Sequence, residues 1–404
     1  MTGALDGFRV IDLTRILAGP WASQILADLG AEVIKVERLG QGDDTRAWGP
    51  PYMPDKNGAA TTESAYFHCA NRGKQSVCID ISTDAGQELI RELVQQSDVF
   101  IENFKQGGLK KYGLDYDQLS QLNPRLVYCS ITGFGQNGPY ADRAGYDFMI
   151  QAMGGLMSIT GETEQQPMKV GVALADIMTG LYATNAIQAA LIHQLRSGQG
   201  QYIDMALLDV QVATLANQAM NYLATGNNPA RLGNAHPNIV PYQAFQTEDG
   251  FIILAIGNDA QFKRFCELAD RPELARDARF EKNSNRVKNR SELIPEVIEI
   301  MLSRTTSSWL DDLNQQGIPC GPINNIDQVF SDPQVQHRKL QLSLDHPIAD
   351  KVTTVANPIN LSLTPVSYER ASPVLGQHTE QVLKTLLKKD EASIQLLREN
   401  RIIE

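Results

Sequence analysis

The sequence has little positive charge and no long apolar run. Its 404 residues contain 36 Lys and Arg against 47 Asp and Glu, a net charge of −11. This balance argues against nucleic acid and anionic membrane as partners, although local basic positions can still hold a phosphorylated ligand. No apolar stretch approaches the roughly 18 residues of a membrane span, and the first seven residues do not resemble a signal peptide. We therefore expect no membrane partner.

Cysteine is also scarce, and its spacing excludes the common metal motifs. The cysteines are Cys69, Cys78, Cys129, Cys266 and Cys320. They form no C-x-x-C pair and show no zinc-ligand spacing. We interpret them as reduced thiols in strands and helices, and we expect a cytoplasmic protein without a metal site.

Two kinds of apolar segment alternate along the first half of the chain. Short β-branched runs alternate with longer segments of helical composition. Strands are predicted at residues 8–13, 31–37, 75–81, 98–102 and 126–131, and helices at residues 21–29 and 84–96. Strands alternating with helices predict an α/β fold with a doubly wound, Rossmann-like parallel sheet.

Ligands of such sheets lie beyond the carboxyl ends of the strands. Arg15, Leu17 and Ala18 follow the first predicted strand, Arg38 follows the second, and Asn103 follows the fourth. NAD-binding folds usually offer a carboxylate after the second strand, whereas the cation of Arg38 suits a ribose phosphate. The alternative is that these cations, like Lys111, are solvated surface charges.

The segment Gly133–Gly138 has the literal spacing G-x-G-x-x-G. A dinucleotide fingerprint follows the first strand and opens a helix, whereas this segment follows a late strand and runs into Pro139. We therefore predict a glycine-rich turn that lets the backbone approach a ligand.

Asp176 ends a run of small apolar residues, and an apolar helix is predicted over residues 181–195. Aspartate at a loop–helix junction often caps the helix by accepting its first backbone N–H groups. The other interpretation is that Asp176 is a catalytic carboxylate. The pattern alone leaves both interpretations open.

Six further motifs, in order, resemble the class III CoA-transferases, the family of formyl-CoA transferase and carnitine CoA-transferase. The similar stretches are residues 5–38, 102–109, 122–125, 197–201, 318–322 and 375–379. The resemblance implies that Asp176 is the catalytic nucleophile, which forms an aspartyl anhydride and then an aspartyl-CoA thioester. It implies acyl-CoA as substrate, no tightly bound cofactor and no metal.

The resemblance also implies a binding site for coenzyme A. Carried over by position, this site comprises Arg15, Leu17, Ala18, Arg38, Ile79, Ser82, Asn103, Lys111, Arg143, Ala144, Tyr146 and Asp147. The chain looks closer to the succinyl-CoA-using branch of the family than to the formyl branch, so we expect succinyl-CoA as donor and a short dicarboxylate as acceptor. The glycine run of formyl-CoA transferase is absent near residues 254–259, which disfavours formyl-CoA and oxalate.

Two other functions are compatible with this family. The 2-methylacyl-CoA racemases share the aspartate but carry Gly-His-Asp where this chain has Gly145-Tyr146-Asp147. Tyrosine, with an unperturbed pKa of about 10, is a poor substitute for a histidine base. A catalytically silent CoA-binding protein is the third hypothesis.

The pattern changes near residues 226–230, where glycine, asparagine and proline predict a domain boundary. We expect a large CoA-binding domain over residues 1–226, a small α+β domain over 227–321, and a return segment over 322–404. A hairpin is predicted at residues 241–255, with helices at 206–223, 261–269, 291–303, 306–315 and 379–387.

The acid substrate has fewer candidate contacts in the sequence. Asn234 and His236 form a polar cluster that either holds its carboxylate or only satisfies backbone groups. Arg15 and Arg72 are further candidates for that carboxylate. The family resemblance implies an interlocked homodimer.

Overall fold

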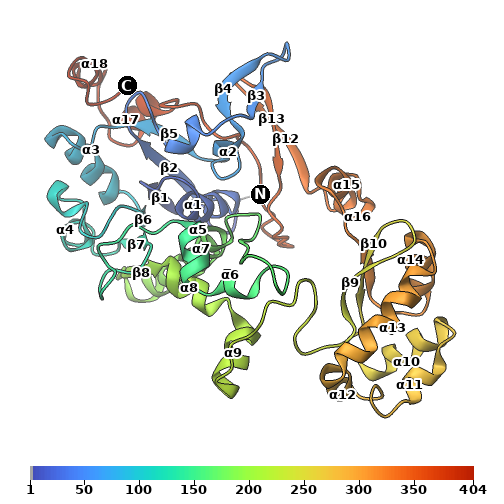
Figure 1. Ribbon diagram of the computed structural model, residues 1–404. Coiled ribbons are helices and arrows are strands. Elements are labelled where there is room, and N and C mark those ends of the chain that lie inside the picture. Colours follow the sequence, from blue (N-terminus) through green and yellow to red (C-terminus); the bar gives the residue numbers. More distant parts are fainter. Residues whose placement is uncertain (1–2) are drawn as a thin grey trace. The chain divides into compact units, whose positions relative to one another are not determined.

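The computed structural model describes residues 3–404, which form two compact units (Figure 1). The first unit holds the described residues up to 156 together with 170–220 and 334–404. The second holds residues 157–169 and 221–333. In residues 3–404, no helix combines the length and the apolar character that crossing a membrane requires.

A six-stranded parallel sheet forms the centre of the first unit. Its strands are β1 (Arg9–Asp12), β2 (Glu32–Glu37), β5 (Gln75–Cys78), β6 (Val99–Glu102), β7 (Val127–Thr132) and β8 (Tyr202–Ala206). Their spatial order is β5-β2-β1-β6-β7-β8, and every neighbouring pair is parallel. The predicted parallel α/β sheet is therefore confirmed. The strand order reverses between β1 and β6, which is where sheets of this kind bind ligands.

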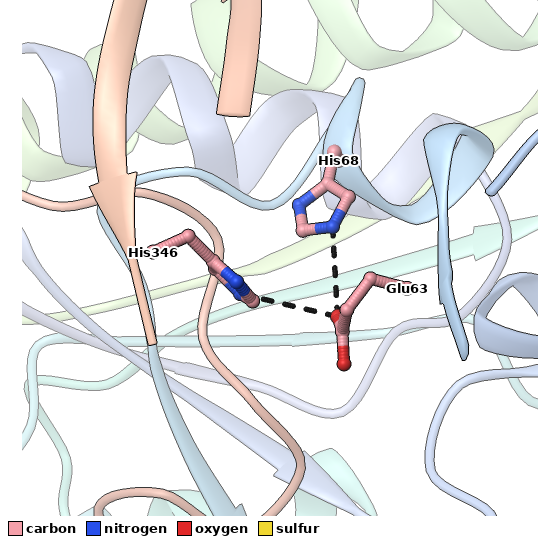
Figure 2. A group of neighbouring side chains, drawn as sticks. All are labelled: Glu63, His68 and His346. Carbon is pink, nitrogen blue, oxygen red and sulfur yellow. Dashed lines mark ion pairs between the residues drawn. The ribbon is translucent and has the colours of Figure 1, made fainter. Parts of the chain in front are cut away.

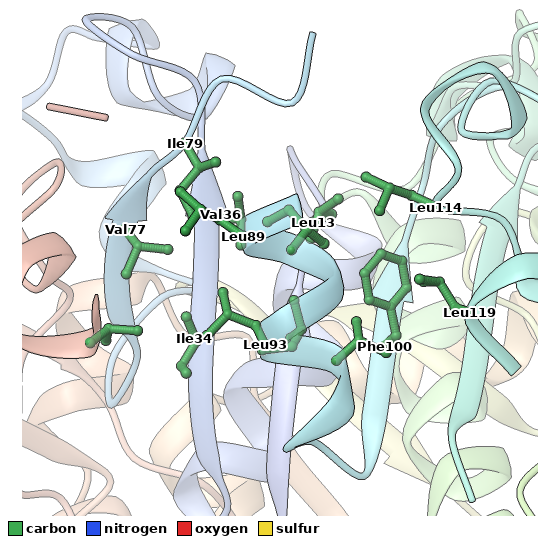
Figure 3. Packing of buried hydrophobic residues seen from close by; sticks show 14 of the residues in the cluster. Leu13, Ile34, Val36, Val77, Ile79, Leu89, Leu93, Phe100, Leu114 and Leu119 are labelled. Carbon is green, nitrogen blue, oxygen red and sulfur yellow. The ribbon is translucent and has the colours of Figure 1, made fainter. Parts of the chain in front are cut away.

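Helices cover both faces of this sheet. On one face α1 (Ala18–Asp28) packs against α7 (Leu174–Ser197), and both contribute to one buried cluster. On the other face α3 (Asp84–Gln95) and α4 (Tyr116–Leu122) cover the second cluster, in which Leu89 and Leu93 of α3 face the strands (Figure 3). Each fully buried aliphatic side chain of such a cluster stabilises the fold by roughly 1.5–3 kcal/mol.

The C-terminal segment returns to the sheet. Helix α17 (Thr379–Thr385) packs against β5, where the hydroxyl of Thr379 accepts the backbone N–H of Cys78 at 3.0 Å. Figure 1 shows this red segment beside the blue strands. A last helix, α18 (Glu391–Glu399), buries Ile394. Asp390 is the N-cap of this helix.

The second unit has its own sheet and core. Strands β9 (Tyr242–Gln246), β10 (Phe251–Ala255) and β11 (Cys320–Pro322) are antiparallel in the order β11-β10-β9, which confirms the predicted hairpin. Its helices include α10 (Asp259–Leu268), α11 (Pro272–Arg276), α12 (Asn283–Lys288), α13 (Arg290–Leu302) and α14 (Thr306–Gln315). Trp309 of α14 lies in the centre of its apolar cluster.

Further elements complete the two units. They are η1 (Asp44–Ala47), β3 (Tyr52–Pro54), β4 (Ala60–Ser64), α2 (Ala65–His68), η2 (Lys110–Tyr112), α5 (Asp147–Met153), α6 (Leu156–Ile159), α8 (Leu207–Ala213), α9 (Ala216–Thr225), α15 (Ile326–Ser331), α16 (Pro333–His337), β12 (Gln341–His346) and β13 (Asp350–Val355). The single helix predicted over residues 206–223 is wrong. Ala216 adopts φ +47°, which breaks the helical backbone between α8 and α9.

Candidate active site

A cavity of about 450 Å³ lies at the carboxyl end of the sheet, at the point where the strand order reverses. The loops after β1 and β6 line it, together with residues 143–146 and the start of α7. Nine of the predicted site residues meet there: Arg15, Leu17, Ala18, Asn103, Lys111, Arg143, Ala144, Tyr146 and Asp176.

A second cavity of about 490 Å³ contains three further predicted residues of the first unit. Arg38, Ile79 and Ser82 line it. Arg15, Phe104 and Tyr112 line both cavities, so the two spaces are neighbours. Sequence reasoning did not assign a role to either aromatic residue, although Phe104 follows directly after the predicted site residue Asn103.

Asp176 is the third residue of α7, and its side chain lines the first cavity. It is not the helix cap. The N-cap residue is Ala173, which has no side-chain cap, and Oδ1 of Asp147 accepts the N–H groups of Ala175 at 2.8 Å and of Asp176 at 3.3 Å. Asp147, which we predicted to bind CoA, is not among the residues that line this cavity, and its carboxylate caps α7. Burial and then the nearby charge of Asp147 raise the pKa of Asp176 to about 7.

The loop between β1 and α1 forms one wall of the cavity in a strained conformation. Ile16 adopts φ +74°, which is rare for a β-branched residue. Three bonds hold the loop there: Oδ1 of Asp43 accepts the Ile16 N–H at 3.1 Å, and the Asn103 amide accepts the Arg15 N–H at 3.0 Å and donates to the Arg15 carbonyl at 2.8 Å. Asn103 therefore joins the ends of β1 and β6 across the switch point.

Two buried ion pairs lie beneath this loop. Nζ of Lys35 contacts Asp43 at 2.9 Å, and Nζ of Lys74 contacts Asp12 at 3.1 Å, with all four side chains excluded from solvent. Burial by itself raises the pKa of the Asp12 carboxyl. Lys74 and Lys35 outweigh that effect and lower it to about 2. Lys35 also donates to the carbonyl of Thr14 at 2.8 Å, so the ion pairs anchor the loop.

The cations of the two cavities are arranged around a shared carboxylate and aromatic rings. Asp44 binds Arg15 at 2.7 Å and Arg38 at 3.0 Å, so one carboxylate bridges the neighbouring spaces. The Lys111 ammonium lies 4.5 Å from the ring centre of Tyr112. An anionic ligand of these arginines has to compete with Asp44.

The remaining candidates lie elsewhere. Asn234 and His236 belong to the second unit, where the His236 ring lies 5.3 Å from that of Tyr242. Arg72 is buried, and its guanidinium donates to both carboxylate oxygens of Asp28 at 2.8 and 2.7 Å. It is therefore not available to bind a substrate carboxylate.

Among residues 3–404, one cluster has the composition of a metal site, and its hydrogen bonds do not fit a metal. In Figure 2 the buried rings of His68 and His346 point at Glu63, whose Oε2 lies 3.5 and 3.9 Å from their Nε2 atoms. Nδ1 of His346 accepts the N–H groups of Ile348 and Ala349 at 3.3 and 3.0 Å. The proton of the neutral ring therefore sits on Nε2, which has no lone pair for a metal.

The fold and the site together define an α/β protein in which the carboxylate of Asp176 faces a cavity lined by arginine and lysine side chains. The model of CoA-transferase family III matches residues 5–379, and the chain belongs to this family. It is accordingly a transferase.

Similar proteins cover nearly the whole chain. The chain is 55% identical to succinate–glutarate CoA-transferase of Agrobacterium fabrum over 95% of each chain. It is 45% identical to human succinyl-CoA:glutarate CoA-transferase over 96% of this chain and 87% of the human one. The crystal structure of a CAIB/BAIF family protein from Brucella suis superposes with a TM-score of 0.84 at 51% identity, covering 96% of this chain and 100% of the other.

Proposed function

We propose that this protein transfers coenzyme A from succinyl-CoA to a short dicarboxylic acid of the size of glutarate. The observation that carries the proposal is the Asp176 carboxylate, which faces the cavity while Asp147 caps its helix. One relative named above is described as a succinate–glutarate CoA-transferase and the other as a succinyl-CoA:glutarate CoA-transferase, and these descriptions support the choice of donor and acceptor.

Asp176 supplies the covalent step. One carboxylate oxygen attacks the thioester carbonyl, a C–O bond forms, and the C–S bond breaks to release the CoA thiolate and an aspartyl anhydride. The thiolate then attacks the aspartyl carbonyl, which gives an aspartyl-CoA thioester and frees succinate. The incoming acid repeats these steps in reverse. The overall reaction exchanges one thioester and one carboxylate for another thioester and another carboxylate, so it requires no ATP.

The two neighbouring cavities would hold the extended CoA molecule. Arg38 and Lys111 are the proposed phosphate partners, since arginine and lysine both suit phosphate oxygens. The other proposed contacts are Arg15, Leu17, Ala18, Ile79, Ser82, Asn103, Arg143, Ala144 and Tyr146. Asn234 and His236 stay proposed contacts of the acid. An interlocked homodimer in the cytoplasm also stays a proposal.

Racemisation is the weaker alternative. It needs a second base beside Asp176, and Tyr146 occupies the position where we expect that base, with 63% of its surface exposed. A tyrosine hydroxyl is a poor general base, so we expect no exchange of the α-proton of a 2-methylacyl-CoA.

Mass spectrometry of the intact protein tests the proposal. The protein is mixed with succinyl-CoA and quenched with hydroxylamine, and peptides are mapped. We expect a hydroxamate at Asp176 and none in Asp176→Asn. Transfer of CoA from succinyl-CoA to glutarate by Asp176→Asn at the parental rate would refute the proposal. Parallel reactions with acetyl-CoA and 2-methylacyl-CoA identify a different donor if succinyl-CoA leaves Asp176 unmodified.

A further inference from the structure

Asp147 and Gln151 hold the N-terminus of α7 from outside the helix. Oδ1 of Asp147 accepts two of the first N–H groups of α7, and Oδ2 accepts the side-chain N–H of Gln151 at 2.8 Å. Gln151 is fully buried, and its Oε1 accepts the Val170 N–H at 2.9 Å. Two side chains of α5 therefore fix the segment that leads to Asp176.

This arrangement determines the orientation of the Asp176 side chain. An aspartate in the first turn of a 24-residue helix is normally drawn back to the free N–H groups and the positive end of the helix dipole. Asp147 already occupies the N–H groups of Ala175 and Asp176. Burial and the charge of Asp147, and no hydrogen bond, account for the raised pKa of the Asp176 carboxylate. That carboxylate consequently remains turned toward the cavity.

The charge of Asp147 adds a second effect. Two carboxylates close together repel each other when both are ionised. Acylation of Asp176 forms a neutral anhydride, and the negative charge leaves with the CoA thiolate. The repulsion is therefore present before the attack and absent in the acyl-enzyme, so it favours the forward step.

We propose that Asp147 is a positioning residue, which caps α7 in place of Asp176 and whose negative charge drives acylation of Asp176. This proposal rests on the proposed function only for its kinetic consequence. The cap and the charge effect can be measured on the free protein, without any substrate.

Two substitutions separate the cap from the charge. In Asp147→Asn the amide oxygen can still accept the two N–H groups, because asparagine is as good an N-cap as aspartate, but the charge is gone. In Asp147→Ala both the cap and the charge are lost. Asp142→Asn is the matched control, since Asp142 is an exposed carboxylate of the same loop and does not line the cavity.

The first experiment follows the carboxyl carbon of Asp176 by NMR in protein labelled at aspartate, with the resonance assigned from Asp176→Asn. In the parent and in Asp142→Asn we expect it to titrate near the raised pKa of about 7. In Asp147→Asn we expect it to titrate at a lower pH, toward the ordinary aspartate pKa of about 3.9. An unchanged titration in Asp147→Asn would overturn the electrostatic part of the proposal, whatever the reaction turns out to be.

The second experiment measures transfer from succinyl-CoA to glutarate over pH 5–9. In the parent, activity should fall on the acid side of about 7, where Asp176 becomes protonated. Asp147→Asn should move this acid limb to lower pH and reduce the burst of acyl-enzyme. Asp147→Ala should lower kcat on the order of 100-fold with little change in the KM for succinyl-CoA, because the nucleophile is misplaced. Parental kcat in Asp147→Ala would refute the positioning role.

These readouts separate the two possible failures. If the parent transfers no CoA while the NMR titration behaves as expected, the proposed function fails and the positioning role of Asp147 stands. Folding of each variant is checked by urea unfolding, and Asp147→Asn keeps the test decisive if Asp147→Ala does not fold.

Discussion

The side chain of Asn103, after β6, pairs with both backbone groups of Arg15, after β1. It accepts the Arg15 N–H at 3.0 Å and donates to the Arg15 carbonyl at 2.8 Å. The pair bridges the two strands between which the sheet order reverses. Because the next residue, Ile16, has φ +74°, the loop needs such bonds to keep its shape.

Asn103→Ala should therefore loosen this wall of the cavity. Loss of two partly buried hydrogen bonds should lower the free energy of unfolding by about 1–3 kcal/mol, and the KM for succinyl-CoA should rise. Asn103→Asp keeps the acceptor for the Arg15 N–H but loses the donor. Its free energy of unfolding and its KM should therefore lie between those of the parent and of the alanine variant. Urea unfolding and steady-state kinetics measure both effects. An alanine variant with parental stability and KM would contradict the bracing role.

Asp44 should restrain the binding of acyl-CoA. It pairs with Arg15 and Arg38, and these half-exposed pairs each contribute about 0.2–1 kcal/mol. Asp44→Asn releases both guanidinium groups, so the KM for succinyl-CoA should fall about two- to fivefold at low salt, and the difference should shrink at high salt. Glu369→Gln, which removes an exposed charge elsewhere, is the control. A higher KM in Asp44→Asn would mean that Asp44 orients the arginines for the ligand.

The sequence alone predicted the sheet well and its site only in part. Buried parallel strands are largely apolar runs, so residues 98–102 and 126–131 were recognisable as strands without knowledge of their neighbours. Asp147 was assigned to CoA by position, because nothing in a linear pattern says that its carboxylate meets the start of α7, 28 residues on. The contacts of Asn103 and Arg72 likewise depend on segments that only the folded chain brings together.

The start of α7 shows the same limit for local patterns. The apolar periodicity predicted a helix from residue 181, whereas α7 begins at Leu174. The first turns contain glycine and aspartate and have no side-chain N-cap of their own. Asp147 supplies the missing cap through space, so the helix extends beyond what local propensity indicates.

His346 should make the protein less stable in mild acid. Burial, followed by the charge of His68, lowers the pKa of His346 in the folded protein. The unfolded chain then binds more protons below the ordinary histidine pKa of about 6.5, so folding stability falls as pH drops through 6.5 toward the folded pKa. His346→Asn, whose amide oxygen can accept the bonds of Ile348 and Ala349, should lose less stability between pH 7.5 and 5.5.

Urea unfolding at these two pH values measures this difference. The exposed His193 gives the matched control, His193→Asn, which should retain the parental pH dependence. Glu63, whose pKa the neighbouring His68 lowers in spite of burial, contributes only at lower pH, near the ordinary glutamate pKa of about 4.3. If His346→Asn loses as much stability as the parent over this range, His346 is not the group that titrates.

The ionised carboxylate of Asp176 should destabilise the folded protein at neutral and alkaline pH. Its folded pKa of about 7 lies above the ordinary value of about 3.9, so the folded protein holds a proton that the unfolded chain has released between these values. The penalty is absent below pH 4, grows as pH rises, and is complete above pH 7. Asp176→Asn resembles the protonated form at every pH, so its urea midpoint should exceed that of the parent most at pH 8 and progressively less toward pH 5. If the parent is as stable as Asp176→Asn at pH 8, the ionised carboxylate of Asp176 does not destabilise the folded protein.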